Sequence, residues 1–114
     1  MLPVQVTIRD IPNSQVLETH IRDKSAKLQH YYDHINSCRV VVEVPQKHKH
    51  QGKIFGVRID LSVPGKELVV NKKENEDVYI AVREAFHAIE RQLEKYAERR
   101  RGDVKLHQES FDQE

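Results

Sequence analysis

The chain has 114 residues, of which 38% are hydrophobic and 32% are charged, and it contains one cysteine. This length favours a single domain with a modest core, and no apolar run approaches the length that crosses a bilayer. The N-terminus lacks a basic region followed by an apolar block, which argues against a secretory signal. Because a lone Cys38 cannot form an internal disulfide, we expect a cytoplasmic protein that does not associate with membranes.

The net charge of +1 conceals an asymmetry along the chain. Residues 102–114 contain four acidic residues and one lysine, a net charge of −3, so residues 1–101 carry +4. A basic body followed by an acidic tail keeps nucleic acid among the candidate partners, although the overall charge is close to neutral.

The first half of the chain predicts a strand, a helix and a second strand. Residues 4–8 alternate between apolar and polar side chains, which is typical of a strand with one buried face. Residues 12–14 (PNS) break this strand and offer a helix cap. A helix is expected from Ser14 to Ile35, and a second alternating strand covers residues 38–44. The expected helix has an apolar stripe formed by Leu17, Ile21, Leu28, Tyr32 and Ile35.

The second half predicts a hairpin followed by the longest helix. Residues 55–63 alternate as a third strand, and Pro64-Gly65 has the chemistry of a type II turn that leads into a fourth strand over residues 67–72. A helix is expected over residues 76–101, with a left-handed stop at Gly102. Its predicted apolar stripe consists of Tyr79, Val82, Phe86, Ile89, Leu93 and Tyr96, and we expect its two tyrosines in the core or at the core edge.

The element order is therefore β-α-β-β-β-α. Each strand alternates, so the sheet buries one face, and each helix has one apolar stripe that must cover that face. We predict an α+β fold, a two-layer sandwich in which two helices lie side by side on one face of a four-stranded mixed sheet. Residues 1–102 form the predicted domain, and residues 103–114 form a disordered acidic tail.

Three cations lie four residues apart on the long helix, at Arg91, Lys95 and Arg99, and we call them the basic ridge. The first helix carries Lys24 and Lys27 along one flank. If the two sets lie near one another, they form the kind of cationic surface that binds a phosphate backbone through counterion release. The alternative is an ordinary solvated surface in which the cations pair with nearby acids, namely Glu84, Glu90, Glu94 and Glu98.

A polar loop over residues 46–53 adds Lys47, Lys49 and Lys53. These lysines either reach a second stretch of backbone or belong to a flexible solvated loop, and the sequence leaves both possibilities open. The two histidines of the loop lack a third ligand for a metal. No phosphate-binding loop or nucleophile motif occurs, so we predict neither catalysis nor a cofactor. Cys38 is expected to pack as a small hydrophobic residue.

Four short segments resemble the ribosome hibernation-promoting factor family, which includes the inhibitor called protein Y. Residues 24–28 (KSAKL) and 31–35 (YYDHI) are similar to the family's first helix, which ends in an aromatic-rich turn. Residues 77–82 (DVYIAV) and 91–95 (RQLEK) are similar to its last helix. The segments occur in the family's order, and the resemblance spans roughly residues 2 to 100.

The resemblance implies a fold related to double-stranded-RNA-binding domains and a bacterial factor that binds the small ribosomal subunit. Such a factor occupies the channel for messenger and transfer RNA and blocks translation in stationary phase or stress. The family's RNA-facing helix positions correspond here to Lys24, Lys27, Arg91 and Lys95. Ala88 stands where relatives often carry a cation, and the cations expected to compensate are Arg83, Arg100 and Arg101.

Two other functions remain open from the sequence. One is a module that binds structured RNA away from the ribosome, and the other is a protein-interaction regulator such as a sigma-factor modulator. Within the family, short members act with a small partner protein that pairs ribosomes, whereas tail-bearing members keep ribosomes single. The tail here is intermediate in length, and we expect a monomer that opposes pairing.

Overall fold

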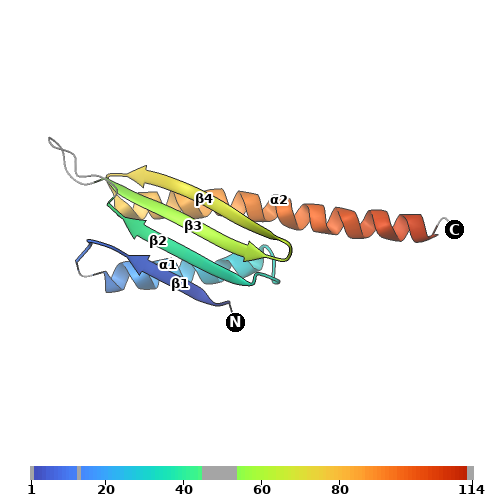
Figure 1. Cartoon of the computed structure of the whole chain (residues 1–114), viewed down its shortest axis with the longest axis horizontal. Helices are drawn as coiled ribbons and strands as arrows, with labels where there is room; N and C mark the ends of the chain where they lie inside the picture. Colours follow the sequence, from blue (N-terminus) through green and yellow to red (C-terminus); the bar gives the residue numbers. More distant parts are fainter. Residues whose placement is uncertain (1, 13, 45–53, 113–114) are drawn as a thin grey trace.

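The computed structural model describes residues 2–12, 14–44 and 54–112, and it describes the side chains of residues 2–12, 14–44, 54–71 and 73–102. The expected element order is confirmed (Figure 1). The elements are β1 (Val4–Ile8), α1 (Gln15–Lys27), a 3-10 turn (Leu28–His30), β2 (Ser37–Glu43), β3 (Phe55–Val63), β4 (Lys66–Asn75) and α2 (Val78–Asp112).

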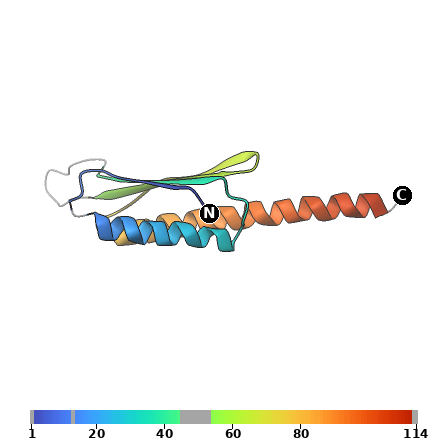
Figure 2. The ribbon, with the colours of Figure 1, turned by 90° about the horizontal axis from the view of Figure 1, so that it is seen from below.

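The sheet has the strand order β1-β2-β3-β4. Strand β1 runs parallel to β2, while β2 and β3, and β3 and β4, are antiparallel. Both helices lie on the same face of this sheet (Figure 2), with α1 packed against β1 and α2 packed against β3 and β4. The predicted two-layer α+β sandwich is therefore confirmed.

The core lies between the two layers. Alternate residues of β2 and β3 are buried, as their sequence pattern predicts, and the α2 side chains of Val82, Phe86, Ile89 and Leu93 are fully buried against them. Tyr96 is also buried, whereas Tyr79 is 42% exposed and lies at the edge of the core. Tyr79 belongs to the first turn of α2 and packs edge-on against the His20 ring at the helix surface.

Helix α1 is shorter than predicted. It ends at Lys27 and tightens into a 3-10 turn, which is common at helix C-termini. Leu28 and Ile35 are both buried, so the apolar pattern was informative about burial although it did not mark one continuous helix. Ser14 is the N-cap residue, as predicted, but its side chain forms no capping hydrogen bond. Its backbone carbonyl accepts a hydrogen bond of 2.8 Å from the Glu18 amide.

The β3–β4 hairpin turns at Pro64-Gly65. Gly65 has φ of +75°, as the second central residue of the predicted type II turn requires. Strand β4 is longer than expected, because it contains a register shift: Ile59 pairs with Val70, whereas Val57 pairs with Lys73. The extra β4 residue between these pairs forms a bulge that lets the strand continue to Asn75.

Helix α2 starts at a side-chain cap and continues beyond its predicted end. The Asp77 carboxylate accepts hydrogen bonds from the amides of Tyr79 (2.9 Å) and Ile80 (3.3 Å). The helix passes through Gly102 to Asp112 and projects beyond the sheet (Figure 1), so the predicted stop at Gly102 is wrong and residues 103–112 are helical. A glycine inside a helix costs only about 1 kcal/mol relative to alanine, which does not by itself end the helix. The boundary at residue 102 between the predicted domain (residues 1–102) and the predicted tail (residues 103–114) remains a prediction.

Phe86 provides a direct test of the packing of α2. Phe86→Ala should lower the free energy of unfolding by about 3–5 kcal/mol, because it removes a fully buried ring and leaves a cavity. Denaturant unfolding would measure the loss. The matched control is His87→Ala, at an exposed position of the same helix, which should change stability by no more than about 0.5 kcal/mol. Equal effects of the two substitutions would contradict the proposed packing.

Candidate nucleic-acid interface

All three cations of the basic ridge are exposed on α2. Their four-residue spacing keeps Arg91, Lys95 and Arg99 on one side of the helix, while Leu93 and Tyr96 between them face the sheet and are buried. The helix is therefore held by its apolar side, and the ridge is carried on a backbone whose position is fixed by the core.

The ridge is not neutralised by neighbouring acids among the side chains that the structure describes. Within those residues, ion pairs up to 4.0 Å occur only at Arg9–Glu43, Arg22–Glu18, Arg58–Asp60 and His34–Asp33. The four glutamates of α2 that could have paired with the ridge do not appear in this set. Unpaired cations on a fixed surface attract polyanions more strongly than cations already engaged in ion pairs.

The cations of α1 form a second group, along the seam between the two helices. The His20 ring lies 5.2 Å from the Tyr79 ring, centroid to centroid, so this side of α1 faces α2. Lys24 and Lys27 follow His20 by four and seven residues and share its side, while Arg83 follows Tyr79 by four. We call Lys24, Lys27 and Arg83 the basic seam. Burial, followed by the nearby Lys24, lowers the pKa of His20, which favours its neutral form.

The basic ridge reaches the opposite side of α2. Lys95 and Arg99 line a surface hollow together with Lys66 and Leu68 of β4, on the side away from α1. Lys95 and Arg99 therefore lie on the side of α2 that faces β4, whereas Lys24 and Lys27 belong to the side of α1 that faces α2. Arg100 lies elsewhere, with its guanidinium 6.0 Å from the centre of the Tyr96 ring.

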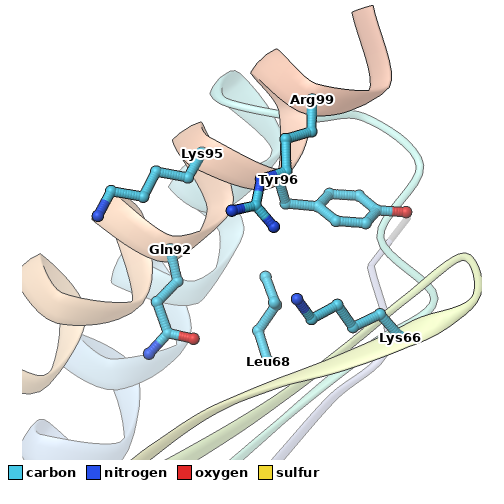
Figure 3. Close-up of a pocket in the computed structure, with 6 residues that line it drawn as sticks. All are labelled: Lys66, Leu68, Gln92, Lys95, Tyr96 and Arg99. Carbon is cyan, nitrogen blue, oxygen red and sulfur yellow. The ribbon is translucent and has the colours of Figure 1, made fainter. Parts of the chain in front are cut away.

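The hollow between β4 and α2 has a volume of about 170 Å³ and is lined by Lys66, Leu68, Gln92, Lys95, Tyr96 and Arg99 (Figure 3). We call it the basic notch. Two hydrogen bonds close its walls: the Gln92 side-chain amide donates to the Val69 carbonyl (2.9 Å), and the Tyr96 hydroxyl donates to the Pro64 carbonyl (2.6 Å). Lys66 is not among the site residues predicted from the sequence, although its alternation with Leu68 and Val70 in β4 places it on the helix-covered face.

The remaining predicted site residues cannot be placed. Lys47, Lys49 and Lys53, with the two histidines between them, lie outside the described residues. Within the part of the chain that the structure describes, no three histidine, cysteine, aspartate or glutamate side chains are grouped so as to hold a metal ion. No described helix is both long enough and apolar enough to span a membrane.

Cys38 lies in the core, as predicted. Its side chain is 1% exposed, and its thiol donates a long hydrogen bond of 3.9 Å to the hydroxyl of Ser25. That hydroxyl in turn donates to the carbonyl of Ile21 at 2.8 Å. Burial raises the pKa of the Cys38 thiol from 9.0 to about 11, so the protonated form predominates at neutral pH and the thiol is a poor nucleophile.

Thiol labelling would test this burial. At pH 8 the folded protein should react with an aromatic disulfide reagent at least about tenfold more slowly than the unfolded protein, because the raised pKa and the burial both suppress attack by the thiolate. Absorbance of the released thiol measures the rate. Equally fast reaction in the folded and the unfolded protein would show that Cys38 is accessible.

Comparison with known proteins identifies relatives over most of the chain. Residues 4–101 match the family described as "Sigma 54 modulation protein / S30EA ribosomal protein". A ribosome hibernation promoting factor of Pseudomonas putida is 30% identical over 98 residues, which cover 86% of this chain and 89% of that protein. A factor of the same name from Azotobacter vinelandii is 28% identical, covering 86% of this chain and 85% of its own length.

Two solved structures share the fold. A ribosomal subunit interface protein from Coxiella burnetii aligns with a TM-score of 0.70 and 22% identity, covering 83% of this chain and 97% of that chain. The N-terminal domain of Thermus thermophilus Protein Y aligns with a TM-score of 0.68 and 22% identity, covering 84% of this chain and 99% of that chain. The α+β architecture of this chain is therefore shared with both of these proteins.

Proposed function

Because the chain belongs to the Sigma 54 modulation protein / S30EA ribosomal protein family, we propose that it is a ribosome hibernation factor that binds the small ribosomal subunit through ribosomal RNA. Relatives named ribosome hibernation promoting factor align over most of both chains, which supports the proposed role. This role places the protein in the bacterial cytoplasm during stationary phase or stress.

The observation that carries the proposal is the set of cations that remain unpaired among the described side chains. The basic ridge and the basic seam place six cations on the helical layer, and none of them lies within 4.0 Å of a described carboxylate. An A-form RNA helix offers rows of phosphates rather than readable base edges, so a rigid cationic surface is suited to it. Lys24 and Lys27 are carried by α1 and the basic ridge by α2, so one protein would contact two stretches of backbone.

The proposed mechanism is occupancy. A folded domain bound in the channel between the head and the body of the small subunit excludes messenger and transfer RNA from that channel, and translation cannot initiate. Such a mechanism needs neither catalysis nor a cofactor. It needs affinity for the idle subunit and a shape that fills the site, so that the release of the protein restores the ribosome.

Reversal of the basic ridge tests the proposal. The triple variant with Arg91→Glu, Lys95→Glu and Arg99→Glu should lose at least about 100-fold in affinity for purified small subunits, because three phosphate contacts become repulsive. Cosedimentation in physiological salt measures the loss. The variant should stay folded, since all three side chains lie off the apolar stripe.

The matched control reverses Arg9, Arg39 and Lys73, three exposed cations that lie in or next to strands and outside the basic ridge. It changes the net charge equally and should retain most of the binding. Equal losses in the two variants would indicate general charge repulsion rather than a defined interface. Failure of the parent protein to sediment with small subunits, together with binding to naked RNA at low salt, would instead support a module that acts away from the ribosome.

A further inference from the structure

We propose that the basic notch between β4 and α2 binds one phosphate group of an RNA backbone, with Lys66 as its third cation beside Lys95 and Arg99. The choice of RNA as the source of the phosphate depends on the function proposed above. The assignment of the notch as an anion site depends only on the geometry of β4 and α2. The notch adds Lys66, a strand residue, to an interface otherwise built from helices.

Lys66 owes its position to the hairpin. It is the first residue of β4, directly after the Pro64-Gly65 turn, and strand alternation places it on the same face as Leu68 and Val70. Leu68 is 4% exposed and forms the floor of the notch. Figure 3 shows the Lys66 ammonium and the Arg99 guanidinium directed into the same space above Leu68, with the Tyr96 ring beside them.

The electrostatics of the notch favour an anion. Three of its six lining residues are cations and none is an acid. None of these three cations forms an ion pair with any described carboxylate. Lys66 and Arg99, whose cationic groups are directed at one space (Figure 3), repel one another, and an anion placed between them removes that repulsion. Arg99 supplies a planar fork that can donate two hydrogen bonds to one phosphate, while Lys66 and Lys95 act as point charges.

The notch is held open in advance. The hydrogen bonds from Gln92 to the Val69 carbonyl and from Tyr96 to the Pro64 carbonyl join α2 to the hairpin on both sides of Leu68. A preformed site loses little conformational entropy on binding. The volume of about 170 Å³ well exceeds the ~30 Å³ that one water molecule occupies in the liquid, so a phosphate group fits with part of its hydration shell.

The position of the notch favours a backbone phosphate over a free anion. The notch is an open surface hollow, and it continues directly into the basic ridge, because Lys95 and Arg99 belong to both. A phosphodiester chain can place one phosphate in the notch and neighbouring phosphates along the ridge. A free phosphate would gain only the contacts of the notch, with its charges screened by water.

The test compares Lys66→Ala with Lys73→Ala. Both substitutions remove one exposed lysine from β4, but Lys73 lies near the opposite end of the strand and outside the notch. Binding of each variant and of the parent protein to purified small subunits is measured across a range of salt concentrations. We expect Lys66→Ala to weaken binding about tenfold at low salt and to reduce the slope of log K against log salt by about 0.7–0.9, as for the loss of one phosphate contact. Lys73→Ala should change neither quantity by as much, and Lys66→Arg should retain the parental slope.

Each result bears on one claim. Equal effects of the two alanine variants, or no effect of Lys66→Ala while the parent protein binds, would overturn the notch and leave the proposed function standing. If the parent protein does not bind the subunit, the proposed function fails. The notch is then judged by titrating the parent protein with a short RNA duplex at low salt, and unchanged amide signals of Lys66, Leu68 and Arg99 in the NMR spectrum would overturn it as well.

Discussion

The packing of α2 on the sheet is the constraint on which the rest of the structure depends. Its apolar side chains are buried against β3 and β4, and a fully buried side chain of this size contributes about 1.5–3 kcal/mol. At the hairpin end, Tyr96 bonds to the turn carbonyl of Pro64, and Gln92 bonds to β4. Because these contacts fix the rotation of the helix about its axis, they also determine which cations face solvent and which face the hairpin.

The same helix therefore serves two purposes with two sides. The inward side supplies stability through apolar burial, which salt does not screen, while the outward side carries cations whose attraction to phosphate is screened by salt. Surface ion pairs contribute little to stability. The fold therefore loses little when these cations are left unpaired and available for a polyanion. In the proposed complex, the counterions that these cations release from RNA supply much of the affinity.

The sequence predicted burial correctly wherever apolar residues repeat with the period of a single strand or helix. The alternation in β2 and β3 and the stripe of α2 predicted the layers and most of the core, because burial repeats every two residues in a strand and about every 3.6 in a helix. Gly102 and the early end of α1 were misjudged, since helix ends depend on competing small energies. Strand alternation predicts the face on which Lys66 lies, but not that this residue lies beside cations of α2. That proximity depends on how the hairpin packs against a helix about thirty residues away, which no local pattern encodes.

In the proposed function, the unpaired cations of the helical layer bind ribosomal RNA. The most direct measurement is the affinity of the unmodified protein for purified small subunits as a function of salt concentration, with large subunits as the comparison. We expect saturable binding to small subunits and a linear fall of log K with log salt. The slope should be steeper than about −3, since four or more phosphate contacts are each expected to contribute about −0.7 to −0.9. Affinity that does not change with salt, or equal affinity for both subunits, would contradict the proposed function.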